Sequence, residues 1–278
     1  MGRPDGVSPG GMSDLAAARR RYAKAIGQRE QISSARVLRA FATVPREHFA
    51  GDGPWRIRRE AGRGYSSTAD ADPVHLYDDV LVAIDERRKL DTGLPSLWAH
   101  FFDALDVKEK ERVVQIGCGL GYYSAILSRI VGAQGTVLAI DCNKALAGRA
   151  AANLRRYKNI EVIHGDGCND VGGAADVIIV HAGFNHPHPL WIESLRRNGR
   201  LLVALTKRGR AGIVIKITRL ARCYQAEAVR GIRIIPGKGR GRTPLDERVT
   251  DWWERAVALA PLRFQSIEQG LPSDRKPR

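Results

Sequence analysis

Cysteine, aromatic residues and long apolar runs are all scarce in this chain of 278 residues. Its four cysteines contain no CxxC pair, which argues against a zinc knuckle or a disulfide framework and favours buried, reduced thiols. No stretch approaches the roughly 20 apolar residues that span a bilayer. Residues 1–11 lack the apolar core of a secretory signal. We therefore expect a cytoplasmic protein with no membrane partner.

Acidic residues are fewer than basic residues, especially toward the C-terminus. The formal net charge is +15, and residues 196–278 contain 20 Lys and Arg against 7 Asp and Glu. Such a field attracts nucleic acid, anionic lipid or acidic proteins. The basic residues are dispersed, however, with few aromatic residues between them and no recognised nucleic-acid-binding motif. Nucleic acid is therefore a disfavoured alternative partner, because an arginine-rich solvated surface explains the same composition.

The N-terminal region is predicted to be helical and rich in loops. Apolar residues at helical spacing predict helices over residues 14–26, 34–42 and 95–105. The segment 50–75 is rich in Gly, Asp and Arg and is predicted to be loop. A short apolar strand is expected at 80–84.

Beyond this region, short apolar strands alternate with helices. The pattern predicts strands at 113–116, 136–140, 160–164, 176–180 and 200–205, and helices at 123–131, 144–157 and 189–197. Such alternation indicates an α/β fold whose mostly parallel sheet is covered on both faces. Two longer segments, 213–218 and 227–235, predict an antiparallel hairpin at one edge of the sheet, and 244–259 predicts a final helix.

These patterns divide the chain into four parts. A length of 278 residues suits one core with an accessory region, since domains usually contain about 100–200 residues. We expect a flexible N-terminus (1–12), a helical and loop cap (13–106), a Rossmann-like domain (107–263) and a basic C-terminal tail (264–278).

The most informative motif is a glycine loop between the first strand and helix of the Rossmann-like domain. Gly117, Gly119 and Gly121 follow the apolar strand 113–116 at every second position. Glycine allows a positive φ and a close approach of ligand to backbone, and the helix that follows presents free N–H groups. A loop of this kind holds a nucleotide-like cofactor at the carboxyl ends of the strands.

The spacing of the glycines distinguishes between cofactors. A dinucleotide fingerprint needs its third glycine at position 122, which is Tyr122 here. Gly-Cys118-Gly-Leu-Gly instead resembles motif I of class I methyltransferases, whose loop curves around the methionine part of S-adenosylmethionine. The resemblance implies that Gly117, Cys118, Gly119, Gly121 and Tyr122 contact this cofactor.

Further cofactor contacts are expected at the ends of the next strands. Asp141, followed by Cys142, ends the second strand, where a carboxylate can bind both ribose hydroxyls. Asp166, followed by Gly167, ends the third strand, where methyltransferases of this class place an acid near adenine.

His181 follows the fourth strand, close to the expected position of the methyl group. We include it among the cofactor-binding residues, and it is also a candidate for orienting a substrate, or a base if the acceptor is a hydroxyl or an amine. The histidines at 181, 186 and 188 match no standard metal spacing, so no metal is expected.

Several segments together are similar to the protein-L-isoaspartate (D-aspartate) O-methyltransferase family. Val44-Pro45-Arg46-Glu47-His48-Phe49 resembles the family's VPR-x-x-F, and Tyr77-Asp78-Asp79 resembles its tyrosine–acid element. Residues 117–122 resemble GxGxGY, and 195–203 resemble the entry to its fifth strand. The resemblance implies a Rossmann-like methyltransferase that uses S-adenosylmethionine to O-methylate a carboxylate of a protein or peptide.

One segment departs from the family. The family's GQTIS-x-P aligns with residues 89–95, and its serine, which lies beside the methyl acceptor, falls on Gly93. We therefore take Asp91, Thr92 and Ser96 as candidate catalytic residues, in an acceptor wall formed by residues 85–96 and 181–189. The departure leaves open whether the acceptor is isoaspartyl or another carboxylate.

A carboxylate acceptor is ionised at neutral pH and needs no general base, so alignment with the methyl group does most of the work. Two other functions are compatible with the sequence. One is methylation of a small molecule or nucleic acid, and the other is a non-catalytic binding module that retains the fold. A dehydrogenase is disfavoured because Tyr122 replaces the glycine that a pyrophosphate needs.

Overall fold

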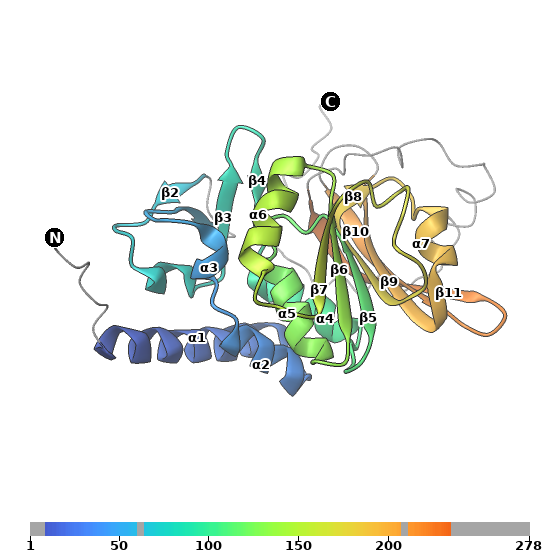
Figure 1. Cartoon of the computed structure of the whole chain (residues 1–278), viewed down its shortest axis with the longest axis horizontal. Coiled ribbons are helices and arrows are strands. Elements are labelled where there is room, and N and C mark those ends of the chain that lie inside the picture. The colour runs from blue at the N-terminus through green and yellow to red at the C-terminus, as the bar shows by residue number, and fades with distance from the viewer. Residues whose placement is uncertain (1–8, 60–63, 207–210, 235–278) are drawn as a thin grey trace, which may run out of the picture.

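The centre of the molecule is a seven-stranded sheet. The computed structural model describes residues 9–59, 64–206 and 211–234. The strand order is β11-β10-β9-β8-β5-β6-β7, with β5 (Arg112–Ile116), β6 (Thr136–Asp141), β7 (Ile160–His164), β8 (Ala175–Phe184), β9 (Leu195–Thr206), β10 (Ala211–Arg219) and β11 (Tyr224–Arg233). Strands β5 to β9 are parallel, and β10 and β11 form an antiparallel hairpin at the edge (Figure 1). The predicted Rossmann-like α/β fold is confirmed.

Both faces of the sheet are buried. Successive residues of a strand point to opposite faces, and accordingly Val113 and Val114 belong to two different hydrophobic cores. The first core includes side chains of α4, α5 and α6, and the second is closed by α7. These helices are α4 (Pro95–Ala104), α5 (Tyr122–Val131), α6 (Lys144–Leu154) and α7 (Pro189–Glu193). The near-continuous apolar strands therefore reflect burial on both sides.

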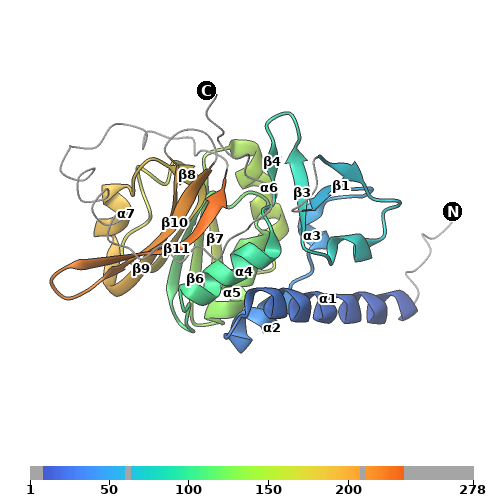
Figure 2. The ribbon, with the colours of Figure 1, turned by 180° about the vertical axis from the view of Figure 1, so that it is seen from behind.

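Three N-terminal helices extend the first core: α1 (Pro9–Glu30), α2 (Ala35–Thr43) and α3 (Glu47–Ala50). Ser34 begins α2 as its N-cap, with its side chain accepting a hydrogen bond from the Val37 N–H. Figures 1 and 2 show α1 lying along the lower edge of the molecule, below the smaller N-terminal sheet. The predicted helices at 14–26 and 34–42 are confirmed, and α1 is longer than predicted at both ends.

The cap contains a second sheet, which the sequence analysis did not predict. Its order is β2-β1-β3-β4, with β1 (Arg56–Arg59), β2 (Ser66–Ser67), β3 (Val80–Asp85) and β4 (Leu90–Asp91), and with a 3-10 turn η1 (Pro73–Leu76) between β2 and β3. The prediction of loop over 50–75 is thus wrong for 56–59 and 66–67. Strand β1 points only Ile57 fully inward, into a small core with Trp55 and Val82. One buried side chain between arginines gives no alternating pattern to detect.

Some element boundaries also differ from the prediction. Helix α7 ends at Glu193 rather than at 197, because Leu195 already pairs with Ala175 of β8 and starts β9. Helix α6 ends at Leu154 instead of 157. The predicted final helix at 244–259 and the basic tail at 264–278 lie outside the described residues.

Candidate active site

The glycine loop joins the carboxyl end of β5 to the start of α5. The backbone N–H groups of Gly117 and Cys118 both donate to the Ile140 carbonyl, at 2.8 and 3.1 Å, which ties the loop to β6. Gly119 has φ +59°, and a Cβ built on it would have as its nearest neighbour Ile84 Cδ1 at 4.0 Å. A side chain at Gly119 would therefore touch one neighbour, at van der Waals distance, so the backbone of the loop is only lightly covered here. Gly121 has a packing role, since a Cβ there would lie 2.7 Å from Leu154 Cδ1.

Asp141 fixes the same loop from the end of β6. Its Oδ2 accepts from the Gly119 N–H and its Oδ1 from the Asn143 N–H, both at 2.9 Å. The residue is 6% exposed. Burial raises the pKa of this carboxyl, while the two backbone hydrogen bonds act in the opposite direction. Each oxygen can accept a further hydrogen bond, so the carboxylate is held in place with capacity for a ligand.

The third strand end is built in a similar way. Asp166 Oδ1 accepts from the Cys168 N–H at 2.9 Å. The adjacent Gly167 is buried, and its carbonyl accepts from Trp191 Nε1 at 2.6 Å, which anchors this turn to α7. A Cβ on Gly167 would lie 2.7 Å from Ile116 Cγ2, so the turn packs directly against the end of β5.

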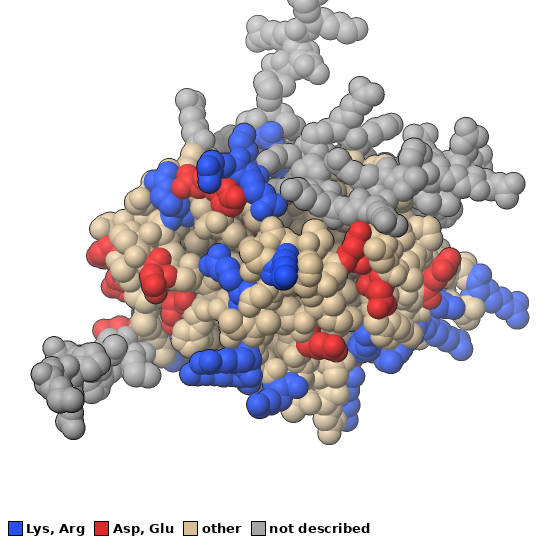
Figure 3. Space-filling model, turned by 45° about the horizontal axis from the view of Figure 1, so that its top comes forward, with Lys and Arg blue, Asp and Glu red and all other residues tan. Residues whose placement is uncertain are grey.

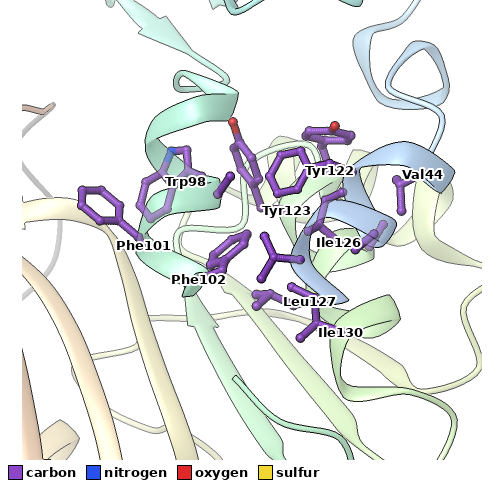
Figure 4. Packing of buried hydrophobic residues seen from close by; sticks show 14 of the residues in the cluster. Val44, Trp98, Phe101, Phe102, Tyr122, Tyr123, Ile126, Leu127 and Ile130 are labelled. Carbon is purple, nitrogen blue, oxygen red and sulfur yellow. The ribbon is translucent and has the colours of Figure 1, made fainter. Parts of the chain in front are cut away.

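Three other predicted cofactor residues differ in accessibility. Cys118 is buried, and burial raises the pKa of its thiol, whereas Cys142 is exposed. The Tyr122 ring packs into the core, with its centroid 5.7 Å from that of Phe49 and its hydroxyl 3.4 Å from that of Tyr22. Figure 4 shows Tyr122 and Tyr123 side by side among these buried residues. Tyr122 therefore offers its backbone, at the start of α5, rather than its ring.

The three candidate catalytic residues lie around the turn between β4 and α4, and each is engaged within the protein. Thr92 Oγ1 accepts from the Val82 N–H at 3.1 Å and from Arg46 Nη2 at 3.3 Å. Asp91 Oδ2 accepts from the Tyr65 hydroxyl at 2.7 Å. Ser96 is buried, and its N–H donates to Asp79 Oδ1 at 2.9 Å.

Gly93, at the position of the family's serine, has a structural reason to be glycine. Its φ is +75°, and a Cβ built on it would lie 2.4 Å from Trp98 Nε1. A side chain there would meet both backbone strain and the indole ring. The Gly93 carbonyl accepts from the Tyr123 hydroxyl at 3.1 Å, so this turn is linked to the first turn of α5.

His181 lies beside the glycine loop and faces α4. A Cβ on Gly117 would be 3.5 Å from the His181 Cβ. The imidazole stacks on the Trp98 indole, with ring centroids 3.6 Å apart and an interplanar angle of 11°. Burial lowers the pKa of His181 to about 3, so the ring is neutral at physiological pH and a poor general base.

A buried polar chain supports His181. Its Nε2 lies 3.1 Å from Gln115 Nε2, and Gln115 Oε1 accepts from the Ser124 hydroxyl at 2.6 Å. Gln115 and Ser124 are fully buried. Sequence analysis missed both residues and Trp98, although a glutamine within the apolar strand 113–116 was a usable signal, because buried polar groups need partners.

The remaining features bear on metal, membrane and nucleic acid. Within the described ranges, no three His, Cys, Asp or Glu side chains gather into a metal-binding group. No helix in the same part of the chain is both long and apolar enough to cross a membrane. Several arginines of the C-terminal region have structural partners: Arg196 pairs with Asp176, and Arg230 pairs with Glu30. On the face in Figure 3, basic and acidic side chains are interspersed rather than forming one continuous basic surface.

Comparison with known proteins gives a consistent result. A family model described as protein-L-isoaspartate(D-aspartate) O-methyltransferase matches residues 62–239. A protein-L-isoaspartate O-methyltransferase of Roseiflexus castenholzii is 34% identical over 75% of this chain and 86% of its own length. Protein-L-isoaspartate O-methyltransferase 1 of Geotalea uraniireducens is 30% identical over 72% of this chain and 83% of its own length.

Two solved structures share the fold. One, a protein-L-isoaspartate O-methyltransferase, has a TM-score of 0.63 and 22% identity, covering 80% of this chain and 67% of its own. The other, from Plasmodium falciparum, belongs to the same class and contains S-adenosyl-L-homocysteine. It has a TM-score of 0.62 and 17% identity, covering 79% of this chain and 98% of its own.

Proposed function

Because the chain belongs to the protein-L-isoaspartate(D-aspartate) O-methyltransferase family, we propose that it methylates a carboxylate of a protein or peptide with S-adenosylmethionine. The observation that carries the proposal is the joint geometry of Gly119 and Asp141. A lightly covered glycine turn and a fixed, buried carboxylate meet at the carboxyl ends of adjacent parallel strands. This is where α/β sheets bind nucleotide-like ligands.

The residues at this end of the sheet fit the cofactor. We assign the amino-acid part to the backbone of Gly119, where one side-chain atom, Ile84 Cδ1, lies within 4.0 Å of the position of a Cβ. Asp141 has acceptor capacity for the ribose hydroxyls, and we assign the adenine contact to Asp166, which follows β7. The backbone N–H groups at the start of α5 favour a negatively charged group such as the cofactor's carboxylate.

Methyl transfer to a carboxylate requires no general acid or base from the protein. When S-adenosylmethionine is bound, an acceptor carboxylate oxygen forms a bond to the methyl carbon as the methyl–sulfur bond breaks with its electron pair going to sulfur, so no proton is transferred. The residues of the site therefore need to align the acceptor and exclude water. A neutral His181 and the internally engaged Asp91 and Thr92 agree with a site that lacks a general base.

The acceptor belongs to a protein or peptide, and isoaspartyl is the first acceptor to test. Relatives named protein-L-isoaspartate O-methyltransferase support it, while Gly93 marks a different acceptor environment. We place the protein in the cytoplasm, where thiols such as those of Cys118 and Cys223 stay reduced.

The test is incubation with methyl-labelled S-adenosylmethionine and three peptides that differ only in an isoaspartyl, an aspartyl or a C-terminal carboxylate. We expect label that is released as methanol at high pH, because methyl esters are labile to alkali. Label that survives alkali would indicate an amine, hydroxyl or nucleic-acid acceptor and would overturn the proposal. Calorimetry with S-adenosylhomocysteine measures cofactor binding independently, and no binding would overturn the cofactor assignment itself.

A further inference from the structure

Trp98 has an indole N–H without a hydrogen-bond partner. Three tryptophans lie in the described part of the chain. Trp55 Nε1 donates to the Gly51 carbonyl at 2.9 Å, and Trp191 Nε1 donates to the Gly167 carbonyl at 2.6 Å. Trp98 is 5% exposed, yet its Nε1 donates to no described group. Although most of the side chain is buried, Nε1 is not among the fully buried unpaired polar atoms of the described residues, so this donor stays accessible and is a candidate ligand contact.

The neighbouring imidazole presents a second such donor. The Ser124 hydroxyl donates to Gln115 Oε1, so the Gln115 amide nitrogen faces His181 Nε2 and donates to it. His181 Nε2 is therefore the acceptor, and in a neutral ring the hydrogen resides on Nδ1. Among the described residues, no group accepts a hydrogen bond from Nδ1. The buried chain thus selects one tautomer and leaves its N–H available.

The rings that bear the two donors lie against each other. The Trp98 and His181 rings stack in parallel, 3.6 Å apart, which fixes both orientations. Trp98 Nε1 lies 2.4 Å from the position that a Cβ of Gly93 would occupy, and His181 adjoins Gly117 of the cofactor loop. Figure 4 shows the indole nitrogen on the same side of the core as the Tyr123 hydroxyl, which bonds the Gly93 carbonyl. The stacked rings therefore lie between the β4–α4 turn and the glycine loop, with the indole Nε1 beside the turn.

We infer that Trp98 and His181 hold the acceptor carboxylate, through the indole Nε1–H and the imidazole Nδ1–H. This inference rests on the proposed function. The two N–H groups can both donate to one carboxylate oxygen, or each can donate to a different oxygen. Either arrangement leaves a lone pair on a carboxylate oxygen free to react. The indole N–H takes the space that the absent Gly93 side chain would have filled.

Neutral donors suit this reaction. The acceptor is an anion before methyl transfer and a neutral ester after it, so its negative charge decreases in the transition state. A cation beside the carboxylate would stabilise the starting state more than the transition state and slow the chemical step. A stacked indole and a neutral imidazole orient the carboxylate without this penalty.

The decisive variant is Trp98→Phe, which removes the N–H and retains an aromatic ring against His181. The matched control is Trp55→Phe, because Trp55 is also 5% exposed and loses one indole N–H in the small sheet of the cap. For Trp98→Phe we expect kcat/KM for the acceptor peptide to fall about 10- to 100-fold, the loss typical of one hydrogen bond to a charged group. The Kd for S-adenosylhomocysteine should stay within about twofold of wild type.

A binding measurement separates this role from a merely structural one. In the complex with S-adenosylhomocysteine, titration with acceptor peptide should shift the indole NMR signal that is absent from Trp98→Phe, and the Trp55 signal should not move. His181→Phe, which retains the stacked ring, is the second variant and should lower kcat/KM to a similar extent.

The outcomes are distinguishable. If Trp98→Phe and His181→Phe retain wild-type kcat/KM, or if the Trp98 indole signal ignores the peptide, the inference is overturned while the proposed function stands. If wild-type protein gives no alkali-labile label with any of the three peptides, the proposed function is overturned and the inference with it.

Discussion

The proposed cofactor side and the proposed acceptor side of the site are built by different means. On the cofactor side, Gly119 and the first turn of α5 offer backbone, and Asp141 adds one carboxylate. On the acceptor side, a stack of two rings, Trp98 on His181, is supported by a glutamine inside the sheet. Backbone recognition depends on a few glycines at fixed spacing, whereas side-chain recognition depends on contacts between distant segments. Backbone recognition therefore leaves a motif in the sequence, and side-chain recognition does not.

The largest effect that would sharpen this comparison is expected at Asp141. Asp141→Ala leaves the N–H groups of Gly119 and Asn143 without their acceptor and removes the proposed ribose contact. We expect affinity for S-adenosylhomocysteine to fall by about 100-fold or more, measured by calorimetry. Asp170→Ala is a suitable control, because Asp170 also caps a loop N–H, that of Gly172, but is exposed. Equal losses in the two variants would contradict the role given to Asp141.

The second prediction concerns the acceptor side at Gly93. Gly93→Ala adds a Cβ at positive φ and within 2.4 Å of the Trp98 indole nitrogen. Gly173→Ala is the matched control, since Gly173 has φ +98° but no atom within 4 Å of its Cβ position. We expect Gly93→Ala to lower the free energy of unfolding by about 1–3 kcal/mol more than the control, the usual cost of overpacking. Urea unfolding measures both, and an equal loss would show that the ring does not restrict this position.

A third variant makes the same glycine-to-alanine change on the cofactor side, at Gly119. Gly119→Ala introduces a methyl group into space that contains no protein atom closer than 4.0 Å, at φ +59°. The expected loss of stability is about 1–2 kcal/mol, from the left-handed backbone alone. Affinity for S-adenosylhomocysteine should fall by about 10-fold or more because the methyl group takes cofactor space. Unchanged affinity would mean that the cofactor does not approach this glycine.

The smallest expected effect is a dependence of stability on pH at His181. Its folded pKa, about 3, lies below the ordinary value of 6.5, so between these values the unfolded chain binds a proton that the folded protein does not. Stability from this group is present above about pH 6.5 and decreases as the pH falls toward 3, by roughly 1.4 kcal/mol at pH 5.5. His181→Phe should reduce the decline in unfolding free energy between pH 7 and 5.5. If the unfolding free energy of His181→Phe changed with pH as steeply as that of the wild type, a buried neutral imidazole at His181 would be contradicted.

The sequence was sufficient for the fold and for the position of the cofactor loop. Alternating apolar strands and helices predicted the parallel sheet and the edge hairpin, because strands covered on both faces are apolar throughout. Strands β1 and β2 were missed since a four-residue strand with one buried side chain, Ile57, lacks a detectable period.

The acceptor side was less predictable for a different reason. Asp91, Thr92 and Ser96 were selected by their distance along the chain from Gly93, and they remain untested as catalytic residues. The stack of Trp98 on His181 joins residues 83 positions apart and follows from the packing of α4 against β8. No local pattern specifies such a contact. Gln115 was the accessible clue, because an amide within an apolar strand requires a partner.

The hydrogen bond from the Tyr123 hydroxyl to the Gly93 carbonyl has a consequence for redesign of this protein. Tyr123 stands two residues after the last glycine of the cofactor loop, in the first turn of α5. Because its hydroxyl bonds the Gly93 carbonyl, this turn of helix also fixes the position of the β4–α4 turn on the acceptor side. Changing substrate preference by rebuilding the backbone around Gly93 would therefore also disturb the proposed binding site of S-adenosylmethionine. New acceptor preferences are better sought by exchanging side chains that line the wall while this tyrosine and the carbonyl it holds are left intact.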